Sequence, residues 1–166
     1  MALRTILTDE DNTLKKRSRE VTSFDARLHT LLDDMLETMR DVSGVGLAAV
    51  QVGVLRRVVI IEITEDELIE LINPEIIETE ETQNGVEGCL SFPGIYGMVE
   101  RPMYVKVKAQ DRFGGEITLE GNALLARAVC HEIDHLNGIV FTDHVTEYVD
   151  AEKAQEEREK QGYKNE

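Results

Sequence analysis

The stretch ALLARAVCHEIDHLNG, residues 123–138, decides the organisation of this chain. It predicts a helix from about Ala123 through Leu136, and the following Asn137-Gly138 pair is typical of a helix end, where glycine accepts a left-handed backbone. Apart from Arg127, the first half of the helix is apolar, and the second half carries most of the titratable side chains. We therefore expect one helix both to pack in the core and to carry chemistry.

Two histidines give this helix its chemical character. His131 and His135 lie four positions apart, so they share one face and can meet a single divalent cation. Glu132 projects about 100° around the helix and can reach a water molecule on the cation instead of the cation itself. A cation lowers the pKa of such a water towards ~7, and a glutamate can take its proton. The pattern indicates a hydrolase, although a helix with two surface histidines would give the same letters.

The other elements follow from hydrophobic periodicity and turn residues. A helix over about 25–41 has apolar residues at helical spacing, and a polar stretch at 147–160 predicts a third, mostly solvated helix. Phe113-Gly114-Gly115 is typical of a hairpin turn. Extended segments are expected at 58–63, at 68–77 with a break at Asn73-Pro74, and near 86–92, 98–109 and 116–120. The order of helices and strands predicts an α+β fold with antiparallel pairing.

Composition limits the class of protein. The chain has 166 residues, 42% of them hydrophobic and 31% charged, which predicts one domain over 1–166 with a polar tail at 146–166. It has no apolar run near 18 residues and no secretory signal at its start, so we expect a cytoplasmic protein. The formal net charge of −15 disfavours broad binding to nucleic acid, and neither DNA nor a membrane is an expected partner.

Two histidines do not complete a metal site, and the sequence offers third ligands on both sides. Upstream lies Cys89 in EGCLSFPG, whose thiolate with two imidazoles would leave one position for water. Cys130 points about 100° away from the ligand face and is expected to be a core thiol. The downstream candidates, as in zinc proteases, are Asp143, His144, Glu152 and Glu157.

Three separated motifs resemble those of one enzyme family. They are GVGLAAVQ at 44–51, EGCLS at 87–91 and HEIDHLNG at 131–138, and together they resemble the peptide deformylases, of the bacterial type 1-like kind. These enzymes remove the formyl group from the N-terminal methionine of new proteins. The resemblance implies antiparallel β-sheets wrapped around a central metal-binding helix, with an N-terminal packing helix and a C-terminal helix.

The resemblance also implies roles for single residues. It assigns metal ligation to Cys89, His131 and His135, and makes Glu132 the general base that activates a metal-bound water for attack on the formyl carbon. Oxyanion stabilisation would come from Gln51 and the backbone N–H of Leu90. The substrate would contact Val45, Gly46, Gly88, Arg101, Leu124 and Ala128, with Arg101 along the groove and Val45, Leu124 and Ala128 around the methionine side chain.

Cofactor and partners are expectations of the same kind. Fe²⁺ is the expected ion in cells, while the ligand types also accept Zn²⁺, Ni²⁺ or Co²⁺. The expected partners are N-formylmethionyl nascent peptides. Residues 147–166 carry seven acidic groups against four basic ones, so we do not expect this tail to hold ribosomal RNA strongly, and any ribosome contact would be transient. The alternatives are a zinc endopeptidase, from HEIDH alone, and a relative that binds peptide or metal without turnover.

Overall fold

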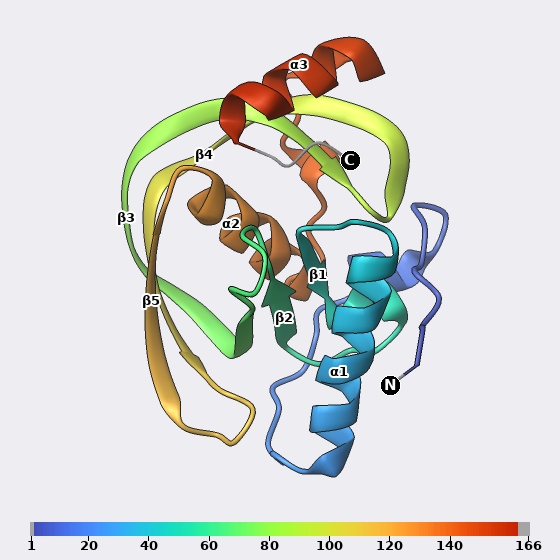
Figure 1. The fold of residues 1–166 in the computed structure, drawn as a ribbon, viewed down its shortest axis with the longest axis vertical. Helices are drawn as coiled ribbons and strands as arrows, with labels where there is room; N and C mark the ends of the chain where they lie inside the picture. The colour runs from blue at the N-terminus through green and yellow to red at the C-terminus, as the bar shows by residue number, and fades with distance from the viewer. Residues whose placement is uncertain (1, 163–166) are drawn as a thin grey trace.

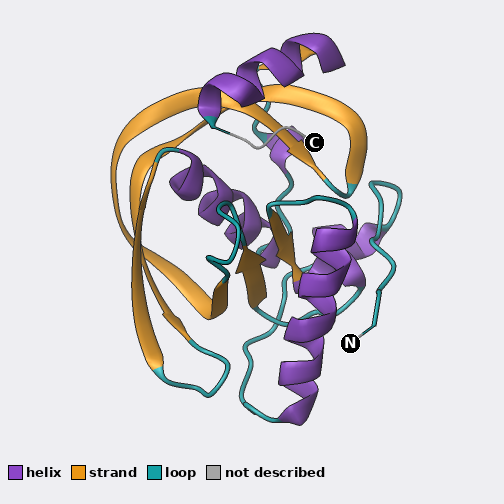
Figure 2. Cartoon of the chain, in the orientation of Figure 1, coloured by secondary structure: helices purple, strands orange, loops and turns teal. Residues whose placement is uncertain are grey.

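The computed structural model of the protein describes residues 2–162, in which six strands form one antiparallel sheet (Figures 1 and 2). The strands β1 to β5 are neighbours in chain order, and β6 pairs with β4. Their bounds are β1 Gly46–Ala48, β2 Val58–Ile61, β3 Ile69–Cys89, β4 Phe92–Gln110, β5 Glu116–Asn122 and β6 Glu147–Val149. The predicted antiparallel α+β class is confirmed.

Three α-helices and three short 3-10 helices complete the described chain. The α-helices are α1 Ala26–Asp41, α2 Leu124–Leu136 and α3 Ala151–Gln161, and the 3-10 helices are η1 Asn12–Lys15, η2 Ala49–Val52 and η3 Phe141–Asp143. Asp25 caps α1 by accepting a hydrogen bond from the Leu28 N–H, which explains why the helix starts there. The expected ends of the first two α-helices are therefore confirmed to within a residue. None of the helices between residues 2 and 162 has the length and apolarity to cross a membrane.

The short strand β2 separates two apolar cores. Val58 and Ile60 point to the side of α1, whereas Val59 and Ile61 point to the side of α2. All four are fully buried, because side chains alternate between the two faces of a strand and both faces are covered here. This explains the uninterrupted apolar run in the sequence and places α2 against one face of the sheet.

The long hairpin of β3 and β4 bends around α2, as Figure 1 shows. A break at Asn73-Pro74 was expected, but β3 continues through it as a bulged strand. Asn73 takes a positive φ of 52° at the register shift, and its Nδ2 donates to Gln110 Oε1 at 2.8 Å. The predicted break is wrong because the bulge absorbs the proline. The hairpin therefore reaches its Leu90-Ser91 turn, next to α2, in one piece.

The tail differs from its prediction at one end. The first three residues of the expected helix, Glu147–Val149, form β6 against Tyr96–Met98 of β4, and α3 begins only after the Asp150 cap. Pairing with a strand fifty residues away overrides the local helical preference. The last part of the expected tail, 163–166, lies outside the described residues.

Candidate metal centre

The helix α2 brings its two histidines together as the spacing predicts. His131 and His135 are buried, with ring centroids 5.1 Å apart. The apolar side chains of α2, among them Ala126, Val129 and Ile133, pack into the core on the same helix. The core thus fixes the axis of α2, and both imidazoles project from a rigid element toward the turn of the hairpin.

Cys89, the last residue of β3, meets these histidines. Its Sγ lies 3.3 Å from His135 Nε2, and the ligand atoms of Cys89, His131 and His135 all lie within 4.8 Å of one another. The upstream ligand is therefore the one that the fold brings to the histidines. Cys130 is buried, and burial raises the pKa of its thiol to about 11, as expected for an inert core thiol.

The chemistry of these three donors fits a first-row divalent metal. One thiolate and two imidazoles suit such ions, and they leave a coordination position for water. His131 Nδ1 lies 2.8 Å from Glu87 Oε1. Because a carboxylate only accepts, Nδ1 carries the proton and Nε2 is left as the free donor. Burial opposes a charged His131, but Glu132, Cys89 and Glu87 outweigh burial and raise the pKa of His131. The same anionic neighbours favour a metal cation at Nε2 in place of a second proton.

Glu132 lies beside these donors, buried within α2. Its Oε1 has no hydrogen-bond partner within residues 2–162, and burial raises the pKa of the carboxyl to about 7. A general base works best when its pKa lies near the operating pH. A Cβ on Gly46 would lie 2.5 Å from Glu132 Oε2, so glycine at that position gives the carboxylate its room. The geometry leaves Glu132 able to accept a proton from a water or a substrate.

Gln51, in η2, points its amide at the same place. Its Oε1 accepts from the Ala48 N–H at 2.9 Å, and its Nε2 donates to Ser91 Oγ at 3.1 Å and lies 3.5 Å from Cys89 Sγ. Because Gln51 Oε1 accepts from the Ala48 N–H, the Nε2 end of the amide faces the thiol of Cys89. The side chain is 1% exposed, and Leu90, the other expected oxyanion donor, lines the same cleft. Ser91 was not singled out from the sequence, although it belongs to the quoted EGCLS motif.

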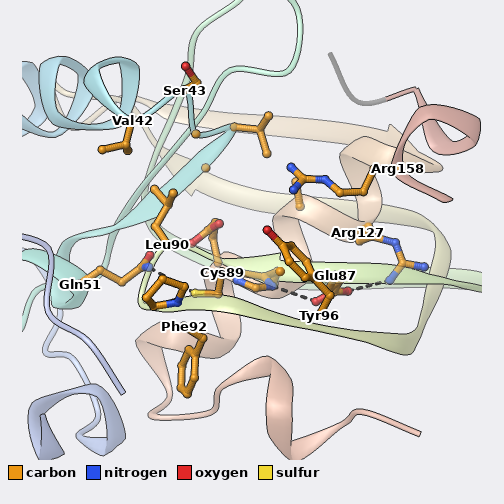
Figure 3. A pocket seen from close by; sticks show the side chains of 18 of the residues that line it. Val42, Ser43, Gln51, Glu87, Cys89, Leu90, Phe92, Tyr96, Arg127 and Arg158 are labelled. Atoms are coloured by element: carbon orange, nitrogen blue, oxygen red, sulfur yellow. Dashed lines mark hydrogen bonds and ion pairs between the residues drawn. The ribbon is translucent and has the colours of Figure 1, made fainter. Parts of the chain in front are cut away.

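Behind His131 lies a buried charge cluster that sequence reasoning missed. Glu87 is 2% exposed and accepts from Arg101 at 2.8 and 2.9 Å, from Arg127 at 2.7 Å and from His131 at 2.8 Å. Burial alone would raise the pKa of Glu87, but the hydrogen bonds from Arg101 and His131 outweigh it and hold the pKa far below its ordinary value. Figure 3 shows Glu87 next to Arg127, with a dashed line for the ion pair between them. The charged Glu87 therefore fixes the His131 ring.

A cleft of about 270 Å³ opens over the candidate ligands (Figure 3). Of the expected substrate contacts, Val45, Gly46, Gly88 and Ala128 line it. Tyr96 of β4 and Arg158 of α3 also line it, and they were not anticipated because these elements reach the cleft only through the fold. Arg127 lines it as well, and it was overlooked although it lies next to Ala128 in α2. The structure thus brings together side chains from six elements or the loops beside them.

Two expected substrate contacts lie elsewhere. Arg101 was expected along the groove, but it is 6% exposed and its guanidinium is held by Glu87 and by Asp134, the latter at 2.6 Å. Arg101 does not line the cleft, because its guanidinium group is already paired with Glu87 on one side and with Asp134 on the other. Leu124, at the start of α2, also falls outside the cleft lining, one helical turn before Ala128.

Comparison with known proteins agrees with this architecture. The family model of polypeptide deformylase matches residues 3–151. The chain belongs to the polypeptide deformylase family. It is 58% identical over 158 residues to the peptide deformylase of Caldicellulosiruptor bescii, covering 95% of each chain, and 55% identical over 159 residues to that of Acetivibrio thermocellus, covering 96% of this chain and 93% of the relative.

Solved structures of the deformylase family have the same fold. The Thermotoga maritima peptide deformylase superposes with a TM-score of 0.85 at 39% identity, covering 88% of this chain and 99% of the other. The Legionella pneumophila enzyme gives 0.84 at 43%, covering 96% and 94%. The resemblance drawn from three short motifs is confirmed, and the chain is an enzyme of this family.

Proposed function

We propose that this protein hydrolyses the formamide at the N-terminal methionine of newly made proteins and releases formate. Family membership supports the reaction class. The observation that carries the proposal is a buried glutamate with an unpartnered oxygen beside a Cys-His-His donor set. These groups lie at the base of an open cleft. All the groups that amide hydrolysis needs thus lie within one small volume.

Cys89, His131 and His135 would hold the metal, which when bound supplies Lewis acidity and lowers the pKa of a coordinated water. Glu132 accepts a proton as the water oxygen bonds to the formyl carbon. It then gives the proton to the methionine nitrogen as the C–N bond breaks, leaving a free amine and formic acid, which loses its proton to become formate. Its raised pKa suits both transfers, because the group must take and release a proton near neutral pH.

Gln51 and the Leu90 backbone N–H stabilise the negative charge that develops on the formyl oxygen. The Ala48 N–H holds the Gln51 amide from behind, so little reorganisation is needed when the charge appears. Losing one donor of this kind typically costs about 100- to 1,000-fold in rate. Ser91 keeps the same amide in place through its hydroxyl, as a positioning residue.

The peptide lies along the cleft as an added strand. Val45, Gly46 and Gly88 offer backbone groups at its edges, and Val45 and Ala128 form the apolar wall for the methionine side chain. Fe²⁺ is the proposed ion in cells, and Zn²⁺, Ni²⁺ and Co²⁺ suit the same donors. Metal analysis after anaerobic purification, with activity measured for each ion, tests this choice.

Formate release from formyl-Met-Ala by reduced, metal-replete protein tests the function. Cys89→Ser should lose the metal and the activity, whereas Cys130→Ser, the matched control on the other thiol, should keep both. Absence of formate release from the wild type contradicts the proposal. Cleavage of internal peptide bonds, with metal retained in Cys89→Ser, would instead indicate an endopeptidase.

A further inference from the structure

A second cleft, away from the metal centre, gathers arginine in an acidic protein. It measures about 630 Å³, and Arg4, Arg19, Arg27 and Arg56 line it; we call it the arginine cleft. The chain has 33 acidic residues against 18 basic ones, so a concave surface with four guanidinium groups runs against the overall charge. Among the described residues that line this cleft, Asp25 is the one acidic residue.

The fold brings these arginines together from distant segments. Arg19, in the loop before α1, forms a parallel β-bridge with Arg56, in the loop after η2. Arg27 stands in the first turn of α1, and Arg4 comes from the N-terminal segment. In Figure 1 the first turn of α1 lies at the opposite end of the long axis from α3. The cleft is therefore remote from the acidic C-terminal helix.

Most of these arginines have no carboxylate partner. Arg4 pairs with Asp34 at 3.0 Å, but Arg19, Arg27 and Arg56 are exposed and take part in no ion pair within the range 2–162. Arg56 hydrogen-bonds only to the backbone carbonyl of Leu55. The Asp25 carboxylate accepts from the Leu28 N–H as the helix cap. Three full positive charges thus face solvent in one concave surface.

Further cations extend the surface along the preceding loop. Lys15, Lys16 and Arg17 are exposed and have no ion pair in the described structure. On β4, by contrast, Lys108 pairs with Glu116 at 3.4 Å and Lys106 lies opposite Glu78 and Glu120 in the strand register. The cations around the arginine cleft therefore form a group that an external anion can bind.

We propose that the arginine cleft docks on the phosphodiester backbone of RNA. Guanidinium groups bind phosphate through paired N–H donors, and a row of them matches a repeating anion. None of the cleft-lining residues described is aromatic, so base stacking is absent and binding follows the backbone rather than the base sequence. The apolar lining residues Val21 and Leu28 are buried and offer no wedge for a membrane.

The partner also suits the proposed function, on which this step rests. A formylated peptide emerges from the ribosome, whose surface is rich in RNA, and the rest of this acidic chain repels such a surface. Docking through the arginine cleft keeps α3 away from the RNA, since the first turn of α1, which lines the cleft, lies at the opposite end of the long axis from α3 (Figure 1). It thereby holds the enzyme near its substrate without use of the tail.

The test measures binding of the full-length, metal-replete protein to a fluorescein-labelled RNA hairpin by anisotropy, over a range of salt. The variant Arg19→Glu/Arg27→Glu/Arg56→Glu removes three phosphate contacts. The matched control is Lys106→Glu/Lys108→Glu/Lys153→Glu, which changes the net charge equally on β4 and α3. Three phosphate contacts contribute a fall in RNA affinity of about 40-fold between about 50 and 200 mM salt. The arginine variant lacks these contacts, so its RNA affinity should depend on salt less steeply by that factor.

The expected result is weakened RNA binding in the arginine variant but not in the lysine control, with ribosome co-sedimentation changing in parallel. All proteins should keep formate release from free formyl-Met-Ala, which shows that they are folded and separates this proposal from the proposed function. If the triple Arg→Glu variant fails to fold, the variant Arg19→Gln/Arg27→Gln/Arg56→Gln takes its place in the test. Equal losses in both variants, no RNA binding by the wild type, or tighter binding to phosphatidylglycerol vesicles than to RNA would each overturn the proposal.

Discussion

Glu87 and Glu70 each hold an arginine with both carboxylate oxygens, but in different surroundings. Glu70 binds Arg112 at 2.9 and 2.6 Å, and Asp33 joins at 3.0 Å with a side chain 42% exposed. Glu87 is 2% exposed and lies between Arg101, Arg127 and His131. The hydrogen bonds in the two clusters have similar lengths. The clusters differ in how deeply the carboxylates are buried and in whether they contact a candidate metal ligand, as Glu87 does through His131.

The difference separates a stabilising contact from a positioning one. A partly exposed ion pair contributes little, because water solvates both partners almost as well when they are apart. A buried pair of similar shape is costly to desolvate and is often no better than apolar packing. The Glu87 cluster therefore needs a reason other than stability, and the hydrogen bond from His131 Nδ1 supplies it.

Removing the buried carboxylate should have the largest effect. Among the described residues, Glu87→Ala leaves Arg127 with only the Val99 carbonyl as a partner and takes one partner from Arg101, so unpaired charge remains in the core. We expect a loss of about 3–5 kcal/mol in the free energy of unfolding. Urea denaturation of the metal-free protein measures it. A loss below that of Glu70→Ala, the matched variant, would break the comparison.

Neutralising the same carboxylate should affect the metal. Glu87→Gln keeps the size of the side chain but weakens its hold on the His131 ring, so we expect metal affinity to fall about 10- to 100-fold. Competition with a chelator of known affinity measures the change. Glu70→Gln is the control, because it makes the same chemical change far from the histidines, and unchanged affinity in both variants would contradict the positioning role.

The smallest effect is expected at the half-buried Glu70 cluster. Glu70→Ala should lower the free energy of unfolding by less than about 1 kcal/mol, because Arg112 keeps Asp33 and gains water. Formate release should equal that of the wild type. Thermal unfolding and the activity assay check both statements, and a loss comparable with that of Glu87→Ala would show that burial does not set the difference.

Local sequence patterns predicted the elements better than their long-range pairing. Helical spacing located α1 and α2, because each has a clear apolar face and an end signal. The bulge at Asn73 and the strand β6 were not foreseen, since both depend on partners in β4 far along the chain. A pattern of a few residues does not encode which distant strand will pair with it.

The candidate site shows the same limit. Cys89, His131 and His135 were predicted to lie together because ligand types at a helical spacing, together with one thiol, carry a chemical signal, and the fold brings them together. Arg101 was expected along the groove, whereas the fold buries it against Glu87 and Asp134. Glu87 was overlooked, although it lies in a quoted motif. A glutamate in a strand has the same letter whether it is solvated or buried among cations, so only the fold reveals its role.

The central claim is that a buried base beside the Cys-His-His set performs the hydrolysis. Formate release from formyl-Met-Ala by Glu132→Gln, with metal content measured on the same sample, tests it most directly. The account predicts full metal content and a rate about 100- to 10,000-fold below that of the wild type, the usual contribution of a general base. A variant that holds its metal and releases formate at the wild-type rate would contradict the account.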